Sequence, residues 1–258
     1  MKRIERFLEV PFLLPVLLFG LADLQPGACF GSAFKVTPVK ILLSHRSPTA
    51  LLTLKNESDR PLRFQASVFL WTQTPEGKME LSPTRDILFF PPIFSVEPGA
   101  TRKVRLGTTA AFGTLEKAYR IFFEELPDLE PAGNSTRSQL QIRTRMGIPI
   151  FLQPAEIESG SRIDSIAAGA GALRFSVRNT GNTHVNLRGI RVRGLDLAGK
   201  SLFERESDGW YVLAEGFRDY EIEIPKDRCE QIARFAIEAL LDGGTVSGNL
   251  EPSASPCR

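Results

Sequence analysis

The amino-acid sequence predicts an all-β protein built as two β-sandwich domains, and three observations lead to this prediction. Apolar and polar residues alternate through most of the apolar segments, and a period of two is typical of half-buried strands. The 21 glycines and 18 prolines fall mostly between these segments, which favours short strands joined by turns. The length of 258 residues accommodates two domains of about 110 residues each.

Residues 1–33 are predicted to form a cleaved secretory signal peptide. Basic residues precede an apolar stretch at residues 10–21, which is too short for a transmembrane helix because crossing a bilayer takes about 20 residues. Ala33 is a small residue suited to cleavage before Phe34. Two alternatives stay open: an uncleaved N-terminal anchor, and a lipoprotein signal ending at Cys29, although the aliphatic residue that begins a lipobox is missing there.

Residues 34–154 are predicted to form the first domain. Apolar residues alternate with polar ones at residues 50–54, 62–72 and 119–124, and turn-forming residues such as those at 97–100 separate the segments. Roughly seven short strands, with turns every 8 to 12 residues or so, are typical of an immunoglobulin-like sandwich.

The last apolar segment of this domain, residues 138–152, predicts one long strand that ends before Pro154. A stretch rich in proline, glycine and serine precedes it at residues 127–137 and predicts a mobile surface loop. One side of the strand is an almost continuous apolar row, formed by Leu140, Ile142, Thr144, Met146, Ile148 and Ile150.

Residues 155–258 are predicted to form a second strand-rich domain, also a β-sandwich. The turn residues at 179–182 separate two alternating segments, and the apolar phase then shifts across Gly189 as a β-bulge would cause. The segment at residues 231–241 is predicted to be a strand, although its apolar spacing would also suit a helix.

Two cysteines remain after cleavage before Phe34, and they predict a disulfide. An even number of cysteines in an exported chain favours pairing of Cys229 with Cys257, because the compartment outside the cytosol is oxidising. The bond would tie the C-terminal tail to the second domain and stabilise it by roughly 3 to 4 kcal/mol. Two unpaired buried thiols are the alternative.

The sequence offers no catalytic, metal or nucleic-acid site. It has none of the motifs GxSxG, HExxH or GxGxxG, and no phosphate-binding Walker loop. Its two histidines, His45 and His184, are expected to be solvated loop residues without a catalytic role. A net charge of +2 gives no electrostatic case for a nucleic-acid partner. We therefore expect a protein that is not an enzyme and that needs no cofactor, metal or small-molecule substrate.

An ordered set of short motifs resembles the PapD-like family of periplasmic chaperones for pilus (fimbrial) subunits, over essentially the whole mature chain. In the second domain, residues 179–182 and 209–214 look like a divergent branch of that family. The motifs of the first domain are Val36-x-Pro38-x-Lys40, Pro91-Pro92-Ile93-Phe94, Pro98-Gly99-x-x-Arg102-x-Val104-Arg105-Leu106, Tyr119-Arg120-Ile121-Phe122, Glu125-Leu126-Pro127 and Ile148-Pro149-Ile150-Phe151.

The resemblance implies two immunoglobulin-like domains in a boomerang arrangement, located in the periplasm. It implies that the last strand of the first domain is lent to a pilus subunit whose own fold lacks a strand, with an outer-membrane usher as a second partner. Leu140 and Ile142 are the main expected donor residues, and Thr144, Met146 and Ile148 continue the row. From Met146 onward, packing in the protein's own core is an equally favoured alternative.

The resemblance also implies basic residues that bind the C-terminal carboxylate of the subunit. The first of them corresponds to Lys40. The second, a lysine in the family, falls on Pro149, so Arg145 or Arg143 on the same strand is expected to take its place.

The family's salt bridge between the two domains is altered in this chain. Glu116 matches its acidic member, whereas Gln153 stands at the arginine position, and both are expected to lie at the contact between the domains. Self-association through the exposed edge strand is a further expectation. The alternative function is a non-catalytic periplasmic or cell-surface adhesion module that binds through loops such as residues 127–137, with the edge of the donor strand covered.

Overall fold

The computed structural model describes residues 33–74, 76–127, 142–253 and 255–257, all of which belong to one compact unit. The predicted signal peptide lies outside this part, apart from Ala33. Eighteen strands and one 3-10 turn, η1 (Cys229–Gln231), make up the regular structure of the described residues. No helix within them is long and apolar enough to cross a membrane.

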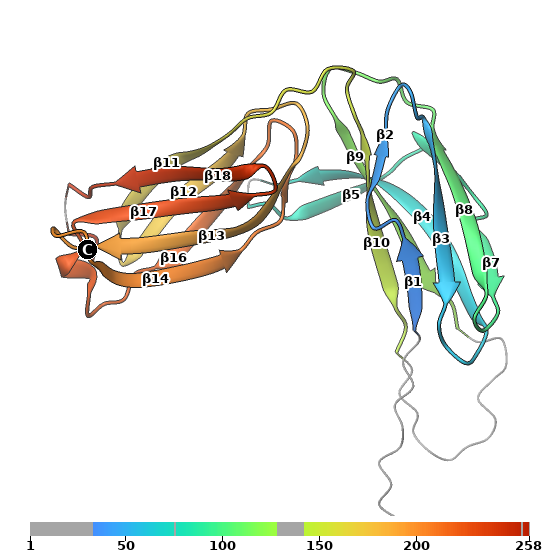
Figure 1. Cartoon of the computed structure of the whole chain (residues 1–258), viewed down its shortest axis with the longest axis horizontal. Coiled ribbons are helices and arrows are strands. Elements are labelled where there is room, and N and C mark those ends of the chain that lie inside the picture. Colours follow the sequence, from blue (N-terminus) through green and yellow to red (C-terminus); the bar gives the residue numbers. More distant parts are fainter. Residues whose placement is uncertain (1–32, 75, 128–141, 254, 258) are drawn as a thin grey trace, which may run out of the picture. The chain divides into compact units, whose positions relative to one another are not determined.

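The first sandwich contains β1 to β10, arranged in two sheets (Figure 1). One sheet has the strand order β1 (Phe34–Thr37), β3 (Thr49–Asn56), β8 (Thr101–Thr108) and β6 (Ile87–Phe90). The other has the order β2 (Ile41–Leu43), β10 (Arg145–Leu152), β9 (Lys117–Glu125), β4 (Leu62–Gln73) and β5 (Met79–Pro83), with β7 (Ile93–Val96) also paired to β4.

The alternating residues of the first sandwich fill its core, as the period-two pattern predicts. Along β4, Leu62, Phe64 and Ala66 are buried between the two sheets, with the polar residues between them on the other face. On that other face the pattern changes near the end of the strand, where Trp71 is only 1% exposed. Other residues of the chain must therefore cover the outer face of β4 at Trp71.

β10 is shorter than the strand predicted for residues 138–152. It begins at Arg145, although residues 142–144 are described. The ladder with β9 ends where the backbone N–H of Glu125 donates to the carbonyl of Thr144 at 3.0 Å. Pro127 has no N–H to continue such a ladder, which explains why the strand does not extend further toward its N-terminus.

The second sandwich contains β11 to β18. One sheet has the order β11 (Ser161–Gly169), β12 (Ala172–Asn179) and β16 (Phe217–Glu223). The other has the order β14 (Ser201–Asp208), β13 (Val185–Leu195), β17 (Arg234–Leu241) and β18 (Gly244–Leu250), with β15 (Tyr211–Val212) also paired to β13. The two-sandwich, all-β prediction is thus confirmed. The predicted boundary between residues 154 and 155 falls between β10 and β11 and stays a prediction.

Two local predictions for the second sandwich are confirmed, and three of its strands, β11, β14 and β18, were not predicted. The register of β13 against β17 shifts between Leu187 and Gly189, where a bulge was expected. The ambiguous segment forms the strand β17 rather than a helix. Among the missed strands, β11 is irregular: its register against β12 shifts between Asp164 and Ala167, and its Ser165 has a positive φ of 54°. This irregularity breaks the alternation that identifies a strand in a sequence.

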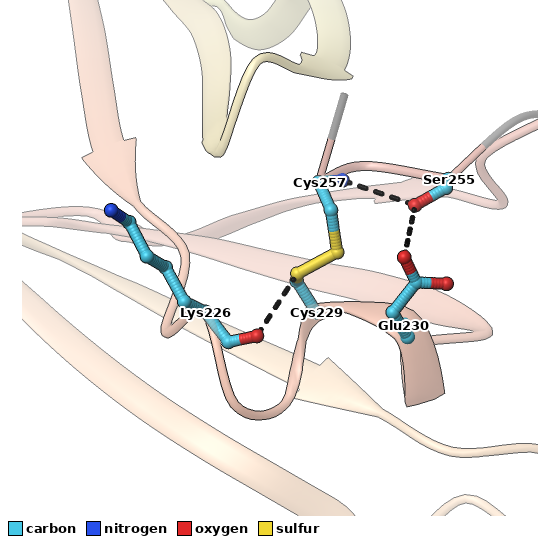
Figure 2. The surroundings of a disulfide bond; sticks show 5 residues. All are labelled: Lys226, Cys229, Glu230, Ser255 and Cys257. Atoms are coloured by element: carbon cyan, nitrogen blue, oxygen red, sulfur yellow. Dashed lines mark hydrogen bonds between the residues drawn. A yellow bond between two sulfur atoms is a disulfide. The ribbon is translucent and has the colours of Figure 1, made fainter.

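The predicted disulfide between Cys229 and Cys257 is present in the second sandwich (Figure 2). Cys229 is 3% exposed and belongs to the core of this sandwich, and Cys257 packs against that core. In the tail, the backbone N–H of Cys257 and the carboxylate of Glu230 both bond to the Ser255 hydroxyl, at 3.3 and 3.4 Å. The C-terminal tail is therefore attached to the body of the sandwich by covalent and polar bonds.

Candidate functional site

The free edge of β10 is the first feature of the candidate site. On one side, β10 pairs with β9 along its whole length. On the other side, β2 pairs in parallel only with Ile150, Phe151 and Leu152. Within the described part of the chain, no strand pairs with residues 145–149 on that side. An edge of this kind presents backbone N–H and C=O groups that can bind another strand.

The predicted donor row is buried progressively along the chain. Ile142 is 55% exposed, Thr144 and Met146 are half-buried, and Ile148 is only 2% exposed. Ile148 belongs to the core of the first sandwich, and Met146 packs against that core. For Ile148, packing in the protein's own core is therefore what the structure shows. Leu140 lies outside the described residues. A donor role for this row stays a prediction, and Ile142 is its exposed described member.

The strand register separates the two predicted carboxylate anchors. Lys40 directly precedes β2, whose first residue, Ile41, pairs with Ile150. Lys40 therefore stands at the level of Pro149. Arg145 is four residues away, or about 13 Å along the strand.

Arg145 is also engaged within the first sandwich. Its guanidinium lies 3.8 Å from the carboxylate of Glu124 and 4.1 Å from the ring centre of Phe122. Arg143 is exposed. The anchor role of Lys40 and Arg145 stays a prediction, and this register does not bring the two cations together.

Arg120, which the sequence analysis did not single out as a site residue, lies opposite Pro149 across the β9–β10 ladder. Its guanidinium lies 5.1 Å from the ring centre of Trp71 and 5.6 Å from that of Trp210. Its Nη2 donates to the carbonyl of Gly147 at 3.3 Å, and its buried Nε has no hydrogen-bond partner among the residues that the structure describes. Burial lowers the pKa of Arg120, because removing a guanidinium from water disfavours its charged form.

An aromatic cluster surrounds Arg120 and joins the two sandwiches. Its buried centre is formed by Trp71, Ala118 and Phe151 of the first sandwich. Residues of the second sandwich that pack against this centre are Trp210, Tyr211 and Leu213. This explains why Trp71 is buried on the outer face of β4. A sequence signal for the contact existed, since Phe69 and Trp71 are aromatic on the otherwise polar side of that strand.

Hydrogen bonds reinforce the aromatic cluster. The side-chain amide of Gln73 donates to the carbonyl of Tyr211 at 2.8 Å and accepts from the backbone N–H of Leu213 at 3.0 Å. The backbone groups of Tyr211 and Leu213 in the second sandwich therefore bond to one glutamine side chain of the first sandwich, as they would to a neighbouring strand.

Glu116 contacts the second sandwich through His184 rather than through Gln153. One carboxylate oxygen of Glu116 lies 2.8 Å from both the backbone N and the ring Nδ1 of His184. The imidazole is stacked on Phe151, with 3.6 Å between ring centres. The prediction that His184 is solvated is therefore wrong, since its side chain is 10% exposed. The backbone N–H of Gln153 donates to the carbonyl of Leu43, which is within the first sandwich.

A second exposed surface, the outer patch, lies on the sheet that does not contain β10. Leu51, Leu88 and Phe90 are 42, 60 and 72% exposed there. Arg105 pairs across the ladder with both Leu51 and Phe90, so the side chains of Arg105, Leu51 and Phe90 share a face. Lys103, two residues earlier on β8, projects from the same face. The outer patch combines apolar side chains with cations.

Comparison with known proteins identifies the first sandwich. The family model described as "Pili and flagellar-assembly chaperone, PapD N-terminal domain" matches residues 33–158. No curated protein sequence matches the chain.

Several solved structures share the fold over most of the chain. A chain of the CsuC–CsuE chaperone–tip adhesion subunit pre-assembly complex of Acinetobacter baumannii is 18% identical, with a TM-score of 0.58, and the match covers 85% of this chain and 98% of that one. The Escherichia coli chaperone DraB is 19% identical with a TM-score of 0.53, covering 86% and 97%. The complex of the Salmonella enterica SafA pilin with the SafB chaperone is matched at 16% identity with a TM-score of 0.54, covering 86% and 99%.

Proposed function

Because the chain belongs to the PapD-like family of pilus chaperones, we propose that it binds pilus subunits in the periplasm, stabilises them by lending them a strand, and delivers them for assembly at an outer-membrane usher. It does this by binding alone and catalyses no reaction. The single observation that carries the proposal is the free edge of β10 at residues 145–149.

The free edge supports donor-strand complementation on physical grounds. A guest strand gains backbone hydrogen bonds from an open ladder, and alternate side chains of the donor fill pockets of the guest. Ile142 is exposed and lies three residues before this edge, on the same row of alternating residues as Thr144 and Met146. Leu140 would extend the same row. Ile148, in contrast, is committed to the core of the first sandwich.

The outer patch supports the delivery step. It lies on the other sheet of the first sandwich, so a subunit paired with β10 would leave it available. Its apolar side chains, with Lys103 and Arg105 beside them, suit a segment of the usher that carries apolar and acidic residues.

The adhesion-module alternative receives less support. It requires that the edge of the donor strand be covered within the free protein. No strand of the described chain covers residues 145–149 on the side of β2.

Co-expression with a pilus-subunit gene adjacent to its own gene tests the proposal. Affinity purification of the chaperone should recover the subunit in a one-to-one complex from the periplasm. Ile142→Asp should reduce subunit recovery at least about tenfold, because an unpaired carboxylate in an apolar groove costs more than 1.4 kcal/mol.

Leu197→Asp is the matched control. Leu197 is 96% exposed and lies in the second sandwich, so this variant makes the same kind of change away from the edge and should recover the subunit normally. Equal recovery with both variants would contradict the donor-strand mechanism.

A further inference from the structure

Asn182 connects three segments of the chain. It lies in the loop between β12 and β13 of the second sandwich and is half-buried. Its backbone N–H donates to the carbonyl of Glu158 at 3.0 Å, and its side-chain oxygen accepts from the N–H of Glu158 at 2.8 Å. Its carbonyl accepts from the backbone N–H of Glu116 at 2.9 Å. Its side-chain amide donates to the carbonyl of Thr114 at 3.0 Å and to that of Glu156 at 2.9 Å.

These bonds join both sandwiches and the segment between them. Residues 114–116 belong to the first sandwich and directly precede β9, whereas residues 156–158 lie between β10 and β11. We call the contacts of Asn182 with these two segments the joint. An asparagine suits this place because its side chain has an NH2 group with two donors and a separate acceptor oxygen, and both are used here. The residue that holds the connecting segment thus also holds the second sandwich to the first.

The aromatic cluster is a second, separate contact between the sandwiches. Within it, the ring of Trp71 lies 5.6 Å from that of Trp210, measured between their centres. Two domains of one chain move relative to each other unless their interface is large and apolar, and the buried centre of this cluster consists of only three residues. The hydrogen bonds of the joint are directional, and they therefore restrict turning of the second sandwich about the cluster.

The second sandwich stands close to the end of the free edge of β10. The pKa of Asp242 in the second sandwich is lowered mainly by its bond to Arg188, and the charge of Lys40 contributes. Lys40 directly precedes β2, which closes the edge of β10 from Ile150 onward. A strand paired with residues 145–149 would therefore end beside the second sandwich, and the orientation of that sandwich would shape the space around it.

We propose that Asn182 is a positioning residue, which fixes the orientation of the second sandwich relative to the free edge of β10 and thereby supports binding of a subunit. The first half of this assignment stands on the contacts of the joint. The second half rests on the proposed function.

Double electron–electron resonance tests the orientation directly. Spin labels are attached at Leu88→Cys and Leu197→Cys, since these positions are exposed on the first and the second sandwich and the native Cys229 and Cys257 are bonded to each other. With Asn182 intact, this pair should give one narrow distance distribution. Asn182→Asp, which keeps the size of the side chain but cannot donate when ionised, should broaden it. Asn182→Ala should also broaden it, because it removes the same bonds without adding a charge.

Amide hydrogen exchange measures how often the joint opens. The N–H of Glu116 bonds to the backbone carbonyl of Asn182, which no substitution at this position removes. Its exchange therefore becomes faster only if the joint as a whole opens more often. The loss of two hydrogen bonds in Asn182→Asp should make this exchange about 5- to 100-fold faster. In the co-expression experiment, the same variant should recover less of the subunit.

Asn249→Asp is the matched control, because Asn249 is exposed on β18 and the change in charge is the same. It should leave the distance distribution, the exchange of the Glu116 amide and the subunit recovery unchanged. Thermal unfolding of each variant measures whether its fold is intact.

Three outcomes would overturn the assignment. An unchanged distance distribution in both Asn182 variants would show that this residue does not fix the orientation. Broadening in Asn182→Asp alone would assign the effect to charge repulsion rather than to lost bonds. A broadened distribution with undiminished subunit recovery would refute the role in binding. Failure of the unaltered protein to recover a subunit would instead contradict the proposed function, and the distance distributions would still decide whether Asn182 fixes the orientation.

Discussion

The two ends of β10 share one residue pattern and have opposite environments. At the C-terminal end, Ile150 is fully buried between β9 and β2 and belongs to the core. At the N-terminal side, Ile142 is 55% exposed, and residues 145–149 have a free edge. The short strand β2 closes the backbone edge at the last three residues of β10 and leaves it free at residues 145–149, while Ile148 in that free stretch is still buried by the facing sheet.

The comparison shows that an alternating pattern specifies a face and not its partner. Period two tells which side chains point together, but whether they meet a core or a guest depends on the facing sheet and on the strands alongside. One continuous apolar row can therefore serve the fold at one end and binding at the other. The predictions below test that division of the strand.

Truncating the buried end should have the largest effect on stability. Ile150→Ala should lower the free energy of unfolding by about 2–5 kcal/mol, because it removes core contacts and leaves a cavity. Ile142→Ala at the exposed end should change it by less than about 0.5 kcal/mol. Urea unfolding of both variants measures the contrast. Equal destabilisation would show that Ile142 also packs in a core, and the division of the strand would be wrong.

Filling the middle of the strand should have an intermediate effect. A Cβ atom added at Gly147 would come within 2.6 Å of the Phe122 ring, which is 7% exposed and lies under the guanidinium of Arg145. Gly147→Ala should therefore destabilise the protein by about 1–3 kcal/mol through overpacking.

Gly113→Ala is the control for this substitution, since the nearest atom to its added Cβ lies at 3.9 Å. It should be close to neutral in the same unfolding experiment. If Gly147→Ala were equally neutral, the middle of the strand would be less closely packed than the Phe122 contact indicates.

Hydrogen exchange should reveal the division without any substitution. Gln153 donates its N–H to Leu43 of β2, and every second amide of a strand points the same way. The amides of Gly147 and Phe151 therefore point to the same side, where β2 is present only for Phe151. The Gly147 amide should exchange at least about tenfold faster than that of Phe151. Comparable protection would indicate that another segment covers the edge.

The sequence by itself determined the fold class and most strands of both sandwiches. Alternation and turn residues are local signals, since each side chain's orientation follows from that of its neighbours. The disulfide was also predictable, because only two cysteines remain after the predicted leader. β11 escaped prediction because its bulge near Ser165 interrupts the alternation on which the prediction relies.

The tertiary structure alone decided which residues meet. It placed Arg120 opposite Pro149 and between Trp71 and Trp210, which lie far apart in the sequence. It also gave Glu116 a partner in His184, a residue that the sequence had suggested was solvated. Such pairings depend on register and on contacts between the sandwiches, and no local pattern encodes these. For the same physical reason, the apolar row of β10 was visible in the sequence, whereas the free part of its edge was not.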